Sequence, residues 1–85
     1  MTDVAREVIQ LRIPSRLELL GLLDRVAALV CERSGLGEDA CSQVTLAVIE
    51  AGTNAIQHGS RGEPDRAVEV EFSLWPDRLE VAVRD

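Results

Sequence analysis

Three polar side chains recur at every fourth position of the stretch LAVIEAGTNAIQHG, which runs from Leu46 to Gly59. They belong to Glu50, Asn54 and His58, and side chains four residues apart lie on one face of an α-helix. A carboxylate held between apolar neighbours is partly desolvated, which favours uptake of a proton, so Glu50 is a candidate general base. The amide oxygen of Asn54, one turn further on, is a hard ligand of the kind that binds Mg²⁺ beside phosphate oxygens.

This helix carries its polar residues in a narrow wedge rather than on a broad face. At about 100° per residue, Glu50, Asn54 and Gln57 share the wedge, with His58 at its edge. A surface helix ordinarily has a broad polar face, so the narrow wedge predicts apolar contacts on both of its flanks. Small residues beside the wedge, such as Gly52, predict room for a ligand against the helix. The flanking apolar residues form two arcs, with Val44, Ala47, Val48, Ala51 and Ala55 on one side and Leu46, Ile49 and Ile56 on the other.

The rest of the chain predicts the elements that must hold this helix in place. Alternating apolar residues predict strands near both ends of the chain, and the capping pattern SRLE, from Ser15 to Glu18, predicts the start of a helix. Gly35 and Gly59 are suitable helix stops. The predicted order is a strand over 6–13, helices over 16–33 and 38–58, and a hairpin of strands over 66–75 and 79–85.

Each predicted helix and strand has one apolar face, so the elements must cover one another. We therefore expect an α+β fold in which two helices pack on one face of a mostly antiparallel sheet. Leu79, Val81 and Val83 alternate inward along the last strand, and by the same alternation Asp85 shares their face. An acid at that position is either a solvated end of the chain or a carboxylate at the mouth of a cleft between sheet and helix.

Composition argues against several classes of function. The 85 residues carry a net charge of −6, and all nine basic residues are Arg, without a basic stripe. We expect no nucleic-acid partner, because Lys and Arg supply most of the affinity for phosphate backbones. No apolar run approaches roughly 18 residues and no leader pattern opens the chain, so we expect a cytoplasmic protein with no membrane partner. Cys31 and Cys41 lack zinc-site spacing and are expected to be small buried residues.

The spacing of Glu50, Asn54 and His58 would also be typical of three solvated helix residues. The surrounding sequence favours a functional site. The stretch LAVIEAGTNAIQHGS resembles the N-box of the GHKL ATPase superfamily, which includes gyrase and sensor histidine kinases. Within that superfamily it is most similar to the anti-sigma-factor serine kinase family. The preceding residues, IPSRLELL through EDACSQ, resemble that family's first helix and connector, and DRLEVAVRD resembles the strand that leads into its Asp-x-Gly-x-Gly box.

Carried over residue by residue, the resemblance implies a site that binds ATP and Mg²⁺. Glu50 matches the general base that takes a proton from the substrate serine hydroxyl, and Asn54 matches the Mg²⁺ ligand that bridges the metal to the nucleotide phosphates. Ala55 matches a position close to the adenine or ribose, and His58 lies where the helix end borders the phosphates. Asp85 matches the aspartate that hydrogen-bonds the adenine amino group, in agreement with its predicted inward direction.

The resemblance implies that residues 1–85 are an incomplete histidine kinase-like ATPase domain, a truncated GHKL (Bergerat-type) α/β sandwich. The N-box is present, and the Gly-x-Gly box, the ATP lid and the C-terminal strands are missing from the sequence. The implied function is that of an ATP-dependent serine protein kinase and anti-sigma factor, which regulates transcription through partner switching by phosphorylating an antagonist protein. Its partners would be a sigma factor and that antagonist. We expect the 85 residues to be inactive alone.

Two alternatives stay open at this point. One is a non-catalytic protein-interaction fragment of the same fold. The other is the ATP-binding domain of a sensor histidine kinase, which fits less well because no substrate-histidine domain precedes residue 1. A truncated sheet would also leave its third strand as an exposed edge, and exposed edges pair with other chains, so we expect a homodimer.

Overall fold

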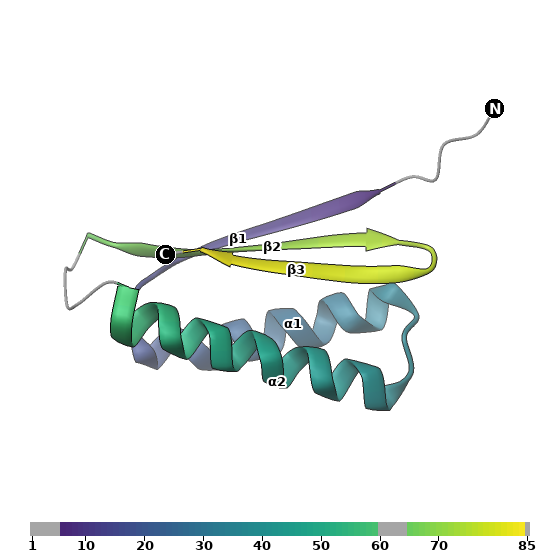
Figure 1. Cartoon of the computed structure of the whole chain (residues 1–85), viewed down its shortest axis with the longest axis horizontal. Helices are drawn as coiled ribbons and strands as arrows, with labels where there is room; N and C mark the ends of the chain where they lie inside the picture. The colour runs from purple at the N-terminus through teal and green to yellow at the C-terminus, as the bar shows by residue number, and fades with distance from the viewer. Residues whose placement is uncertain (1–5, 60–64, 85) are drawn as a thin grey trace.

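Two helices lie side by side across one face of a three-stranded antiparallel sheet (Figure 1). This computed structural model describes residues 6–59 and 65–84. No helix within those ranges is both long and apolar enough to cross a membrane. The expected α+β class is confirmed. In chain order the elements are β1 (Glu7–Pro14), the short 3-10 helix η1 (Leu17–Leu19), α1 (Leu20–Ser34), α2 (Glu38–Asn54), the π-helical turn η2 (Ala55–Gly59), β2 (Ala67–Trp75) and β3 (Arg78–Arg84).

Alternating apolar residues build the central strand of the sheet. The strand order is β1-β2-β3, with antiparallel pairing on both sides of β2. Phe72 is fully buried and lies opposite Ile9 of β1 and Val81 of β3. Trp75 pairs with Arg78 across the turn that joins β2 to β3. The predicted strand bounds are confirmed to within one residue, and the buried face of β2 is the predicted one, formed by Val68, Val70, Phe72 and Leu74.

Both predicted helices are present, but the first one starts differently from the prediction. α1 ends at Ser34, and Gly35 follows with a φ of 79°, in the left-handed region that favours glycine. At the start, the N-cap position of η1 belongs to Arg16, which makes no side-chain cap hydrogen bond, so the predicted register of the capping pattern is wrong. The reason is that the backbone N–H of Ser15 donates to the carbonyl of Arg66 at 3.0 Å, which extends the pairing of β1 with β2 by one residue.

Gly52 of α2 packs against side chains of α1. It is buried, and a Cβ at this position would lie 2.7 Å from Cδ2 of Leu23 and 3.5 Å from Cδ2 of Leu20. The missing side chain therefore serves the packing of one helix against the other. The sequence-based interpretation that Gly52 leaves room for a ligand is wrong, because its open side faces α1.

Gly21 offers a matched comparison, since a Cβ there meets nothing within 4 Å. We expect Gly21→Ala to raise the free energy of unfolding by about 0.5–1 kcal/mol, because alanine loses less backbone entropy in a helix. Gly52→Ala should lower it by about 1–2 kcal/mol, because overpacking against Leu23 outweighs the gain in helix propensity. Urea unfolding of the two variants measures both changes, and shifts in the same direction would contradict the packing role of Gly52.

Candidate functional site

Glu50 and Asn54 lie one helical turn apart on the side of α2 opposite its buried residues. Both side chains are exposed, and neither makes a hydrogen bond or ion pair within the described part of the chain. The expected partial desolvation of Glu50 is therefore wrong. Leu46 and Ala47, which flank Glu50 one turn earlier, are themselves exposed, because α2 touches its neighbours along a narrower strip than its two apolar arcs suggested.

The helix changes its winding directly after Asn54. The backbone N–H of Ala55 points to the carbonyls of both Ala51 and Gly52, and the chain continues as the π-helical turn η2. The hydroxyl of Thr53 also donates to the carbonyl of Ile49 at 2.7 Å, a bond that tends to bend helices. Helical structure thus reaches Gly59, one residue past the predicted end at His58, and its last turn has a wider form that is frequent at functional sites.

The two predicted site residues that follow Asn54 are Ala55 and His58, and they differ in exposure. Ala55 is partly buried and packs against the core, next to the buried Ile56. His58 is exposed, and no hydrogen bond or ion pair to it is found among residues 6–59 and 65–84. Asp85 lies outside the described residues and directly follows Arg84, the last residue of β3.

An apolar groove of about 430 Å³ lies between α2 and β3. We refer to it as the α2–β3 groove. α2 and β3 run in the same direction, so both elements end at the same end of this groove (Figure 1). Asn54 comes three residues after Ala51 on the helix, which places it at that end, and Glu50 has the same relation to Ala47. The lining residues are Val44, Ala47, Val48 and Ala51 of α2 and Leu79, Val81 and Val83 of β3.

The α2–β3 groove shows what the sequence analysis missed. Leu79, Val81 and Val83 were expected to be core residues, but they are only half-buried because α2 does not cover them fully. The signal that could have revealed the groove is the apolar arc of small residues on α2, including Ala47 and Ala51, which the core does not need. A shallow apolar surface of this kind can bind a flat ring. Polar groups are then needed only at the end of the groove.

The donor groups at the end of the groove fit a metal ion that is held together with a nucleotide. Mg²⁺ typically takes one or two protein oxygens and fills its other positions with phosphate oxygens and water. Asn54 supplies one exposed amide oxygen of this type. The described residues contain no group of three or more His, Cys, Asp or Glu side chains that could hold a metal without other ligands.

The two cysteines lie on the other flank of α2 and take no part in this site. Both are free thiols, Cys31 buried and Cys41 half-buried, so the expectation of a small buried residue is confirmed for Cys31. Burial, together with the neighbouring Cys41 thiol, raises the pKa of the Cys31 thiol to about 11. Cys31 therefore stays protonated near neutral pH, which makes it a poor nucleophile and a poor metal ligand.

Comparison with known proteins identifies the fold to which this groove belongs. Residues 13–85 match the model of the family described as "Histidine kinase-like ATPase domain". The chain belongs to this family. The resemblance to the GHKL superfamily, first seen in the residues around Glu50 and Asn54, is thereby confirmed.

This histidine kinase-like ATPase chain is also similar to curated serine kinases. It is 33% identical over 79 residues to the serine-protein kinase RsbW of Bacillus subtilis and 37% identical over 79 residues to that of Bacillus velezensis. In both cases the match covers 93% of this chain and 49% of the relative. The serine-protein kinase RsbW of Listeria innocua is 34% identical over 77 residues, which are 91% of this chain and 49% of the relative. The chain thus spans about half the length of the curated relatives that it matches.

Proposed function

We propose that these 85 residues form the N-terminal part of the ATPase domain of a serine protein kinase that also acts as an anti-sigma factor. The observation that carries the proposal is the position of Glu50 and Asn54, one turn apart on α2 beside the apolar α2–β3 groove. The family match supports ATP as the nucleotide. The similarity to serine-protein kinases supports serine as the acceptor.

Each residue has a distinct task in this proposal. The α2–β3 groove, whose lining is apolar, would hold the adenine ring. Asn54 would hold Mg²⁺ with its amide oxygen, and the metal would supply charge neutralisation for the phosphates. His58 and Ala55 border the phosphate and ribose regions. Asp85 would accept a hydrogen bond from the adenine amino group.

Glu50 acts as the general base in this proposal. Its exposed carboxylate is accessible to a serine on the surface of another protein, which a buried base is not. The carboxylate would take the proton from the serine hydroxyl as the serine oxygen bonds to the terminal phosphorus of ATP, whose bond to the bridging oxygen breaks so that ADP leaves. Phosphoryl transfer requires little covalent chemistry from the protein. The other residues would therefore act by positioning the reactants and by neutralising charge.

The proposed partners are an antagonist protein, which carries the serine, and a sigma factor, both in the cytoplasm. We also propose a homodimer. β3 is an edge of the described sheet, with one hydrogen-bonded neighbour, and such edges pair with other strands. Sedimentation of the purified 85-residue chain at tens of micromolar should give the mass of a dimer, and a monomer mass at that concentration would contradict this part of the proposal.

The kinase proposal is tested by following the terminal phosphate of labelled ATP. The full-length gene product is incubated with Mg·ATP and the antagonist protein of the same organism. We expect label on the antagonist that survives acid and is released by alkali, as phosphoserine behaves. Acid-labile label would instead indicate histidine phosphorylation, and ATP binding without any transfer would favour a non-catalytic interaction module.

A further inference from the structure

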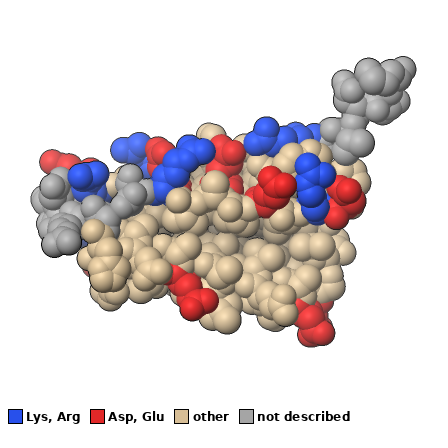
Figure 2. Space-filling model, viewed as in Figure 1, with Lys and Arg blue, Asp and Glu red and all other residues tan. Residues whose placement is uncertain are grey.

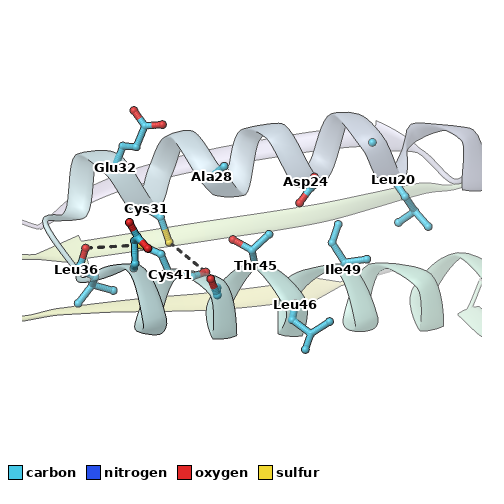
Figure 3. A pocket seen from close by; sticks show the side chains of 13 residues that line it. Leu20, Asp24, Ala28, Cys31, Glu32, Leu36, Cys41, Thr45, Leu46 and Ile49 are labelled. Carbon is cyan, nitrogen blue, oxygen red and sulfur yellow. Dashed lines mark hydrogen bonds between the residues drawn. The ribbon is translucent and has the colours of Figure 1, made fainter.

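A second and larger groove lies on the outer side of the helical layer, between α1 and α2. Its volume is about 820 Å³, and we refer to it as the helical groove. In Figure 3, Leu20 and Asp24 point from α1 toward α2, while Thr45 and Ile49 point from α2 toward α1. Leu46 stands at the α2 rim with 62% of its surface exposed. The groove is therefore an apolar channel that is open to solvent along its length.

Every charged side chain that lines the helical groove is an acid. These side chains belong to Asp24 and Glu32 of α1 and to Glu38 at the start of α2. None of the three forms an ion pair or a hydrogen bond with another described residue. In Figure 2 the helical half of the visible face shows only isolated acidic side chains on an uncharged surface, while the arginines gather along the sheet.

Two arginines near the sheet, Arg12 and Arg33, are engaged by acids of its strands. Arg12 donates to Glu69 at 2.9 Å, across the β1–β2 pair. Arg33 binds the carboxylate of Glu7 through two nitrogens, at 2.7 and 2.6 Å. Arg25 follows Asp24 on α1 but forms no ion pair with any acid of the helical groove within residues 6–59 and 65–84, so these acids are open to a cation from outside.

We propose that the helical groove binds an amphipathic helix of a partner protein, one with an apolar stripe flanked by Lys and Arg. Two helices that lie side by side form a straight groove between them. A ridge of side chains on a third helix can pack into such a groove. Leu20, Leu46 and Ile49 contact the apolar stripe, and Asp24 and Glu38 contact the flanking cations. The positive charge of this helix would distinguish it from other amphipathic helices, since complementary charge steers association and rejects wrong partners.

A second copy of this chain is a poorer occupant than a basic helix. α2 carries Glu38, Asp39 and Glu50 and no Lys or Arg, so two copies meeting at this surface would bring acids against acids. The inference does not depend on the kinase proposal, because the helical groove and the α2–β3 groove lie on opposite flanks of α2 and share no lining residue.

The test uses the full-length gene product and two synthetic 18-residue helical peptides. Both peptides carry a leucine stripe, flanked by Lys in one and by Glu in the other. We expect micromolar binding of the Lys peptide by fluorescence anisotropy, at least tenfold weaker binding of the Glu peptide, and weaker binding at high salt. Peptide-induced shifts of backbone amide resonances should fall on residues that line the groove, such as Leu20 and Ile49.

Charge-matched variants decide whether the helical groove is the binding surface. Asp24→Lys combined with Glu38→Lys should weaken the Lys peptide at least tenfold and restore binding of the Glu peptide. Glu18→Lys combined with Asp39→Lys makes the same change of net charge at exposed positions outside the groove, and should alter affinity less than twofold. Glu38 and Asp39 share the first turn of α2, so both pairs carry a similar cost at that helix end.

A third variant tests the apolar part of the contact. Gly21 lines the groove, and a Cβ there meets nothing within 4 Å, so Gly21→Leu should place its side chain in the groove, leave the fold intact by circular dichroism and weaken the Lys peptide at least tenfold. Equal effects of the two charge pairs would overturn the proposal. So would an unaltered affinity of Gly21→Leu, or the absence of any Lys-peptide binding, which would mean that the groove is covered by other parts of the protein.

Discussion

Truncation of Phe72 to alanine should lower the free energy of unfolding by about 3–5 kcal/mol. The ring is fully buried in the central strand and lies in a row with Ile9 and Val81 across the sheet. A folded chain of 85 residues has a total stability of only about 4–13 kcal/mol, at roughly 0.05–0.15 kcal/mol per residue. The variant therefore loses a large part of its stability, and urea unfolding followed by far-UV circular dichroism measures the loss.

Leu46→Ala is the control for this prediction. Leu46 is also a large apolar residue, but 62% of its surface is exposed, so its truncation should change the free energy of unfolding by less than about 0.5 kcal/mol. If Phe72→Ala and Leu46→Ala were equally mild, the buried face of β2 would not be the centre of the core. The comparison separates burial from hydrophobicity, because both residues are apolar and only one is covered.

The fold could be predicted largely from local patterns in the sequence. Alternation along residues 66–75 fixes which face of β2 is buried, because successive side chains of a strand point to opposite faces. Gly35 marks the end of α1 because its left-handed backbone favours glycine. The start of the first helix was predicted wrongly, since the hydrogen bond between Ser15 and Arg66 joins residues far apart in sequence. A local capping pattern contains no information about that partner.

The candidate site was predicted less completely, for a related reason. The polar wedge of Glu50 and Asn54 and its two apolar flanks were visible in the sequence, but periodicity cannot tell which flank another element covers. In the structure one flank borders the α2–β3 groove and the other borders the helical groove. The two apolar arcs of α2 thus correspond to two open grooves, and the wedge between them is exposed rather than partly desolvated.

Under the proposed kinase function, replacing Glu50 with glutamine should lower the rate of phosphoryl transfer to the antagonist serine by about 10²–10⁴-fold in the full-length protein. Glutamine keeps the size of the side chain and its position beside Asn54, but it cannot accept the serine proton. The affinity for Mg·ATP should change little, because Glu50 is proposed to act on the acceptor and not on the nucleotide. Single-turnover assays with labelled ATP measure the rate, and calorimetry measures the affinity.

Two further variants distinguish a general base from a general loss of acidic charge. Asp39→Asn removes an exposed acid from the same helix and should leave both rate and affinity unchanged. Asn54→Ala should show the opposite pattern to Glu50→Gln, with weaker Mg·ATP binding, since its amide oxygen is proposed to hold the metal. A Glu50→Gln protein that transfers phosphate within threefold of the normal rate would contradict the assignment of Glu50 as the general base. Because Glu50 and Asn54 lie one turn apart, a split between their effects on rate and on affinity would show that this one turn of α2 serves both the acceptor and the nucleotide.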